Sequence, residues 1–224
     1  MMKLIPLNQY PKEFAVPFLH GIPFVTELRI TAPEQLEVLL EHAYFLEAAP
    51  GDVVLKAGSR GERFYFLLYG QMSIYAGNVA DGVEVNRIAA GQSFGALSVI
   101  CDVERIASVA VSVDCKGALL LSIDMRELGK LSDFSVFSLL TKLALFRGVV
   151  HSTRWQLELY KLDYPNHKLA TQGVLVEEFD GKLGTLEELE SLNRQIYQMT
   201  GVMSAWNKQL STEEGRPVFR GGWI

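Results

Sequence analysis

The chain of 224 residues lacks most features that mark secreted, metal-binding or membrane-spanning proteins. It has two cysteines, Cys101 and Cys115, which are too few for a disulfide framework and lack metal-ligand spacing, so we expect buried free thiols. The longest apolar runs, such as 109–113 and 118–123, are too short to cross a bilayer, and the N-terminus lacks the apolar segment of a secretory signal. We therefore expect a cytoplasmic protein that has no membrane partner.

Residue clusters that carry enzymatic chemistry are also missing. The four histidines, His20, His42, His151 and His167, are scattered outside the apolar runs, whereas a metal-binding jelly roll needs a clustered His-x-His on its strands. The motifs of zinc proteases, α/β-hydrolases and P-loop nucleotide hydrolases do not occur. We expect no metal site, no catalytic residues and no enzymatic activity.

Positive charge is scarce as well. The 21 lysines and arginines are outnumbered by 26 acidic residues, and the net charge of −5 gives no long-range attraction to nucleic acid. We therefore do not expect a nucleic-acid partner. The apolar fraction of 49% is that of an ordinary globular protein with a buried core.

Short apolar runs separated by glycine-containing turns fill the middle of the chain. These runs are 53–56, 64–68, 72–75, 83–88, 108–113 and 118–123. Their spacing of roughly ten residues indicates antiparallel strands in a sandwich or barrel rather than a parallel sheet. We predict an α+β fold, an antiparallel β-roll or jelly roll with flanking helices and a C-terminal helical extension.

Helical periodicity precedes and follows these runs. Residues 33–48 are predicted to form an amphipathic helix with Thr31 as N-cap, and 132–162 to form a second helix. We divide the chain into an N-terminal lead-in with a helix (1–50), a β-roll (51–130), a capping or dimerisation helix (131–164) and a C-terminal helical extension (165–224).

The C-terminal extension contains a heptad seam behind a capping box of Thr185 and Glu188. The seam consists of Leu189, Leu192, Ile196, Met199, Met203, Trp206 and Leu210. Two interpretations stay open: the helix docks on its own domain, or it pairs with a second copy across a homodimer.

The stretch from Phe94 to Val109 has the outline of an anion pocket. Backbone N–H groups around Gly95, Ala96 and Leu97 could converge on phosphate oxygens, because glycine permits close approach and a short helical turn would aim its positive end at the anion. Arg105, in an apolar setting, would supply the countercharge.

Two alternatives concern single side chains in this stretch. Arg105 could instead be a surface arginine paired with Asp102 or Glu104. Ser98 could donate to a phosphate or bond locally to the backbone. The candidate ligand-binding residues are Phe94, Gly95, Ala96, Leu97, Ser98, Arg105 and Ile106.

The same stretch resembles the phosphate-binding cassette of cyclic nucleotide-binding domains, which reads F-G-E-(L/I)-(A/G), then about six residues, then R-(A/S/T)-A-(T/S)-V. The matching residues, in register without a gap, are Phe94, Gly95, Leu97, Arg105, Ala107, Ser108 and Val109. Residues 51–70 are similar to the first hairpins of the family, so the resemblance covers about residues 35–160. It departs at Ala96, where the family has the glutamate that holds the ribose 2′-hydroxyl.

The resemblance implies a non-enzymatic regulatory protein that binds a cyclic nucleotide or another phosphate-bearing small molecule and signals through helix rearrangement. The family's helix after the roll often pairs in a dimer, so we expect a homodimer. Regulators related to the catabolite activator protein carry a winged helix-turn-helix after this helix, and no such motif is recognisable in 165–224. Two alternatives are a ligand-free, degenerate sensor that acts as a homodimeric scaffold or interaction protein, and a DNA-binding regulator with a divergent C-terminal domain.

Overall fold

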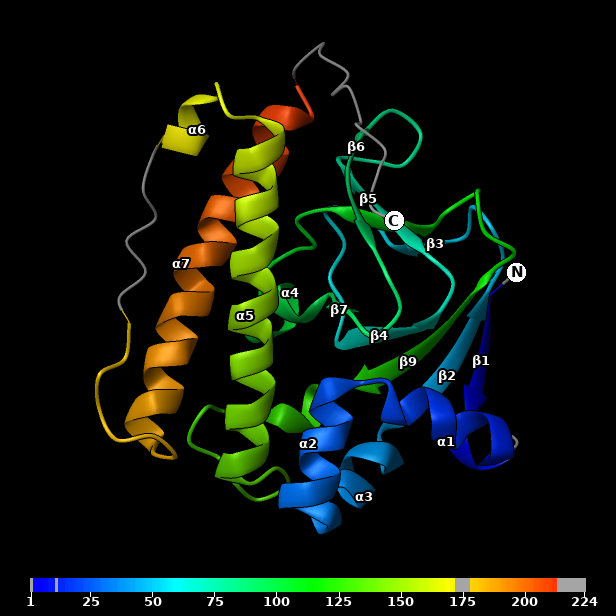
Figure 1. Cartoon of the computed structure of the whole chain (residues 1–224), viewed down its shortest axis with the longest axis vertical. Helices are drawn as coiled ribbons and strands as arrows, with labels where there is room; N and C mark the ends of the chain where they lie inside the picture. The colour runs from blue at the N-terminus through cyan, green and yellow to red at the C-terminus, as the bar shows by residue number, and fades with distance from the viewer. Residues whose placement is uncertain (1, 11, 172–177, 213–224) are drawn as a thin grey trace.

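Two antiparallel sheets and a set of helices make up the protein (Figure 1). The computed structural model describes residues 2–10, 12–171 and 178–212. One sheet has the strand order β1-β2-β9-β4-β7 and the other β3-β8-β5-β6. The strands are β1 (Lys3–Pro6), β2 (Ala43–Ala48), β3 (Val53–Leu55), β4 (Arg63–Tyr69), β5 (Met72–Ala76), β6 (Val83–Ile88), β7 (Ser93–Phe94), β8 (Ser108–Val111) and β9 (Ala118–Asp124).

The sequence prediction of an α+β fold with an antiparallel β-roll is confirmed. All six predicted runs form strands, and every pairing between strands of the described residues is antiparallel. Glycine turns end several of these runs: Gly70 after β4 has a φ of +91°, and Gly77 after β5 has a φ of +89°. The division of the chain into four segments remains a prediction.

The helices are α1 (Lys12–His20), α2 (Pro23–Thr31), α3 (Pro33–Glu41), α4 (Ala96–Ile100), α5 (Leu139–Asp163), α6 (Lys168–Thr171) and α7 (Leu186–Leu210), with 3-10 turns η1 (Leu7–Gln9) and η2 (Arg126–Leu128). Figure 1 shows α5 and α7 running side by side along one flank of the roll, and the two helices pack against each other. Helix α2 packs against α5 as well.

The prediction of one helix over 33–48 is wrong in its second half. Helix α3 ends at Glu41, and Ala43–Ala48 forms β2, which pairs with β9. A short apolar run fits both periods, and here pairing with the fully buried β9 decides for the strand. Thr31 is not an N-cap: it ends α2, and its hydroxyl donates to the carbonyl of Glu27.

The helix predicted from residue 132 begins later, at Leu139. Ser138 is its N-cap, and its hydroxyl oxygen accepts from the backbone N–H of Thr141 at 3.3 Å. The residues before it form turns, one of them closed by Asp133, whose carboxylate accepts from the hydroxyl and the backbone N–H of Ser135. The cap residue therefore sets the start of the helix.

The heptad seam of α7 lies against the protein's own core, since all seven seam residues are buried. Trp206 shows the packing, with its ring 5.6 Å from that of Tyr160 and 4.6 Å from that of His167. The capping box is half formed: Thr185 accepts from the N–H of Glu188, but the Glu188 carboxylate binds Arg147 and the N–H of Gly184. The helix thus docks on its own domain, and the expected homodimer would need another surface.

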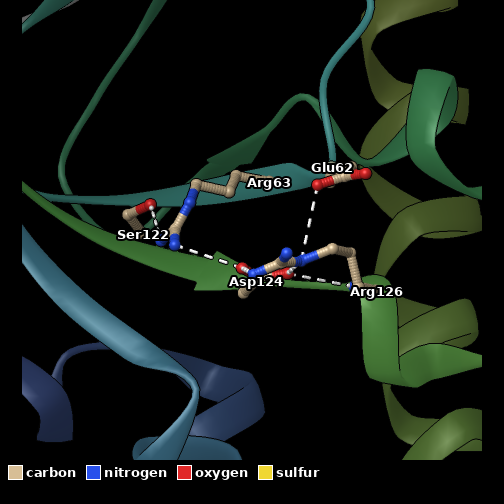
Figure 2. A network of polar contacts seen from close by, with 5 residues as sticks. All are labelled: Glu62, Arg63, Ser122, Asp124 and Arg126. Carbon is tan, nitrogen blue, oxygen red and sulfur yellow. Dashed lines mark hydrogen bonds and ion pairs between the residues drawn. The ribbon is translucent and has the colours of Figure 1, made fainter.

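An ion network joins the ends of β4 and β9 (Figure 2). Arg63 donates to Ser122 and pairs with Asp124 at 3.2 Å, while Arg126 pairs with Asp124 at 2.7 Å and with Glu62 at 3.4 Å. Hydrogen bonding from Arg126 is the main cause that lowers the pKa of Asp124. Asp124 therefore stays ionised in the fold and holds the two strand ends together.

We expect Asp124→Asn to lower the free energy of unfolding by about 1–3 kcal/mol at neutral pH, because charged hydrogen bonds to two arginines are lost. The folded-state pKa is depressed, so this stabilisation is complete above the ordinary aspartate pKa of about 3.9 and is lost as pH falls through the lower folded value. Urea unfolding at neutral and acid pH measures the difference between wild type and variant.

The control for this substitution is Asp114→Asn, because the Asp114 side chain is exposed and its ion pair with Arg87 should contribute less than about 1 kcal/mol. A difference between wild type and Asp124→Asn that does not shrink on acidification, or an equal loss of stability in the control, would show that the ion network does not stabilise the fold.

Candidate functional site

A cavity of about 80 Å³ lies between the 94–109 segment, which we call the cassette segment, and helices α5 and α7. Among the residues that line it are all seven predicted ligand-binding residues: Phe94, Gly95, Ala96, Leu97, Ser98, Arg105 and Ile106. The sequence prediction thus identified residues that the fold brings together around one cavity. Their role in binding a ligand stays a prediction.

Arg105 is the cation of this cavity, and only 5% of its surface is exposed. Its guanidinium donates to the Gly95 carbonyl and the Ser98 hydroxyl through Nη1, and to the Arg63 carbonyl through Nη2 at 2.6 Å. Burial lowers the pKa of Arg105. All three acceptors are neutral groups, so they form hydrogen bonds with the guanidinium N–H groups but do not compensate the positive charge of Arg105.

The alternative in which Arg105 is a surface arginine paired with an acid is wrong. No carboxylate of the described residues pairs with Arg105, and Asp102 lies instead 3.6 Å from Arg60 at the surface. Removing a charge from water without a counter-ion is costly, and a guanidinium does not lose its proton in compensation. The cavity therefore contains a buried, electrically uncompensated cation.

Two glycines make room for the guanidinium. A Cβ on Gly61 would lie 2.8 Å from Nη2 of Arg105, and one on Gly95 would lie 3.1 Å from Nη1. Gly95 also has a φ of +86°, which is strained for other residues. Helix α4 begins after it but has five residues, so its dipole adds little, and the positive potential comes mainly from Arg105.

The wall of the cavity carries no second charge. No acidic residue, lysine or histidine is found among the described residues that line it. Ala96, at the position where a glutamate would be expected from the cassette pattern, is buried and 8% exposed. Most of the remaining lining is apolar and consists of Leu55, Ile74, Phe94, Leu97, Ile106, Ala107, Val109, Val149 and Met203.

Asn207 on α7 connects the cassette segment to α5. Its Nδ2 donates to the carbonyl of Ile106 at 3.1 Å, and its Oδ1 accepts from the hydroxyl of Tyr160 at 2.7 Å. Burial raises the pKa of Tyr160, which keeps the hydroxyl protonated as a donor. A second link joins Cys101 of the cassette segment to Thr200 of α7, with Sγ and Oγ1 3.4 Å apart.

Sequence reasoning missed Asn207, Tyr160 and Gln156, which line the cavity from the two long helices. Asn207 follows the seam residue Trp206 directly, and a polar residue next to a heptad position is usually taken as exposed. The one available signal was the seam itself, because it marks the face of α7 that packs inward. Cys101 is a buried free thiol as predicted, whereas Cys115 is half-buried.

The described residues offer no site for a metal ion: they contain no group of three or more histidines, cysteines or acids that could hold one. None of the described helices is long and apolar enough to cross a membrane. Within the cavity, Arg105 is the group that could attract an anion.

The protein is a β-roll with a cavity beside Arg105, and residues of α5 and α7 line one side of that cavity. The family follows from comparison with known proteins: residues 45–132 match the family model described as cyclic nucleotide-binding domain. This match agrees with the resemblance of the cassette pattern to the same family.

The chain is also similar to curated cAMP-dependent protein kinase regulatory subunits. It is 32% identical over 103 residues to that of Hypocrea atroviridis, a match that covers 46% of this chain and 21% of the relative. It is 32% identical over 104 residues to that of Colletotrichum orbiculare, covering 46% of this chain and 25% of the relative. The match spans a quarter or less of the length of these relatives.

Solved structures with a similar arrangement include the regulatory domain of Toxoplasma gondii PKA with cAMP. It is 18% identical with a TM-score of 0.43, and the match covers 52% of this chain and 43% of that chain. The structure described as cAMP bound PfPKA-R is 16% identical with a TM-score of 0.49, and the match covers 66% of this chain and 46% of that chain.

Proposed function

We propose that the chain is a non-enzymatic regulatory protein whose β-roll binds a phosphate-bearing small molecule, in the first instance a cyclic nucleotide, at Gly95–Leu97 and Arg105. The observation that carries the proposal is the buried guanidinium of Arg105, which lines a cavity and has no carboxylate partner among the described residues. An anionic ligand would supply the missing countercharge. The family match over 45–132 supports a nucleotide as that ligand.

The signal would arise from helix displacement. A cavity of about 80 Å³ is well below the roughly 300–1,000 Å³ of ligand pockets, so a nucleotide needs the wall to move. The movable wall is the one made by α5 and α7, because the opposite wall is strands of the roll. Entry of the ligand would break the bridge from Ile106 through Asn207 to Tyr160 and shift the population of helix arrangements.

The test is calorimetry of the full chain against a panel of cyclic mono- and dinucleotides, with Arg105→Gln as the site variant. We expect Arg105→Gln to weaken binding ten- to a hundred-fold or more, since hydrogen bonds to a charged group contribute about 1.5–3 kcal/mol. Circular dichroism checks that the variant is folded.

The matched control is Arg60→Gln, because Arg60 belongs to the same β3–β4 connection as Gly61 but its side chain is 71% exposed. This variant should bind like wild type. Absence of heat with every nucleotide, or equal affinity in wild type and Arg105→Gln, would overturn the proposal.

A second candidate keeps the fold and drops the ligand: a degenerate sensor that acts as a homodimeric scaffold or interaction protein. The small cavity and Ala96 favour it. The homodimer is a proposal that sedimentation of the intact chain tests: a sedimenting mass of one chain would contradict it. The cytoplasmic location is also a proposal. The DNA-binding alternative gains no support from the described residues after 164, where α6 has four residues and α7 is docked on the core.

A further inference from the structure

The charge of the cavity sets the charge of its ligand. Among the described lining residues, Arg105 is the one ionisable cation, and no acid is present. One buried arginine compensates one negative charge, and a second negative charge would enter a low-dielectric site without a partner. A cyclic phosphodiester carries one negative charge, whereas a phosphomonoester carries about 1.5–2 at pH 7.

The wall that stays in place when the helices move is mostly apolar. The apolar residues that the roll and the cassette segment contribute to it are Leu55, Ile74, Phe94, Ala96, Leu97, Ile106, Ala107 and Val109. Its polar side chains besides Arg105 are those of Ser93 and Ser98, and the Ser98 hydroxyl already bonds to the carbonyl of Gly95 and to Arg105. The ligand's body therefore meets few side chains on this wall that can bind a hydroxyl.

Ala96 brings an apolar side chain to the part of the wall near the guanidinium. Nη1 of Arg105 bonds to the carbonyl of Gly95, and the next residue along the chain is Ala96, which also lines the cavity. In a 3′,5′-cyclic nucleotide the one free sugar hydroxyl is on the carbon next to the cyclic phosphate. A phosphate held at Arg105 thus brings that hydroxyl close to the wall at Ala96.

We infer that the cavity selects a singly charged anion whose body is poor in hydroxyl groups. The inference rests on the proposed function and narrows its ligand. A hydroxyl that leaves water for a wall without a partner loses hydrogen bonds, so removing it from the ligand strengthens binding or leaves it unchanged.

The experiment compares three ligands on the full chain by calorimetry: 3′,5′-cyclic AMP, its 2′-deoxy analogue and 5′-AMP. We expect the 2′-deoxy analogue to bind as tightly as cyclic AMP or up to about ten-fold tighter, and 5′-AMP at least about ten-fold more weakly. A ten-fold loss on removing the hydroxyl, or equal binding of 5′-AMP and cyclic AMP, would overturn the inference.

A gain-of-contact variant checks the wall itself. Ala96→Gln adds a neutral amide beside the ligand without a second negative charge and should reverse the order, so that cyclic AMP binds about ten-fold more tightly than its 2′-deoxy analogue. Ala96→Ser, which adds a shorter polar group, should change the ratio less. An unchanged ratio in a folded Ala96→Gln variant would contradict the placement of the sugar hydroxyl at Ala96, and the wild-type comparison decides the inference if this variant is unstable.

The outcomes distinguish the ligand preference from the proposed function. If cyclic AMP binds through Arg105 but needs its hydroxyl, the inference falls and the proposed function stands. If none of the three ligands binds, or binding is undiminished in Arg105→Gln, the proposed function falls and the inference with it.

Discussion

Trp206→Ala should lower the free energy of unfolding by about 3–5 kcal/mol, the usual range for removing a buried tryptophan. The Trp206 side chain is fully buried, with the rings of Tyr160, Tyr164 and His167 at 5.6, 6.0 and 4.6 Å. These three residues lie on α5 or in the connection after it, so the substitution removes the contact that fixes α7 on the rest of the protein. Urea unfolding followed by circular dichroism measures the effect.

The control is Trp155→Ala, because Trp155 lies on α5 and is 55% exposed. Its loss should change the free energy of unfolding by less than about 1 kcal/mol. Comparable losses in the two variants would show that α7 is not held by its seam.

The Trp206 substitution also tests how the helices act on the cavity. The residue after Trp206 is Asn207, which bonds to Ile106 and Tyr160. If α7 must move before a nucleotide enters, a loosened α7 increases the fraction of molecules that are competent to bind, and the apparent affinity rises by the same factor. In this arrangement stability of the closed state and affinity for the ligand oppose each other.

The sequence predicted the roll better than the helices around it. The strands β3 to β6, β8 and β9 each end at turns with strong local chemistry, so their positions could be located without tertiary information. Strand β2 could not, because the run 43–48 fits a helix or a strand and its partner β9 lies some 75 residues further along the chain. The heptad seam of α7 indicated which face of the helix is buried, but not which element covers it. The spacing of apolar residues identifies the buried face of a helix and carries no information about the surface on which that face packs.

The candidate site was predicted in part for a similar reason. The pattern around Gly95 and Arg105 is local, so the motif alone identified the arginine and its turn. The groups that hold the arginine, the carbonyls of Gly95 and Arg63, are backbone atoms that every residue has, and they leave no signal in a sequence. Asn207 reaches the cavity from a helix about 100 residues away, and only the fold brings it there.

Gly61→Ala should weaken anion binding at least about ten-fold while costing only about 1 kcal/mol of stability. The backbone of Gly61 lies outside the left-handed region, so alanine is not strained there, but its Cβ would lie 2.8 Å from Nη2 of Arg105. The guanidinium must shift, and its hydrogen bond to the Arg63 carbonyl is disturbed. Calorimetry with cyclic AMP and urea unfolding measure the two quantities.

Gly51→Ala is the opposite case and serves as control. Gly51 has a φ of +82°, and a Cβ there would have nothing within 4 Å, so the substitution strains the backbone by about 1–2 kcal/mol and leaves Arg105 in place. The two variants should therefore differ in opposite directions. Gly51→Ala loses more stability than Gly61→Ala but binds the anion like wild type, whereas Gly61→Ala loses less stability and binds the anion poorly. If Gly61→Ala binds cyclic AMP like wild type, the affinity for the anion does not depend on the guanidinium position seen in the structure. The Arg105 side chain would then contact the ligand in another conformation.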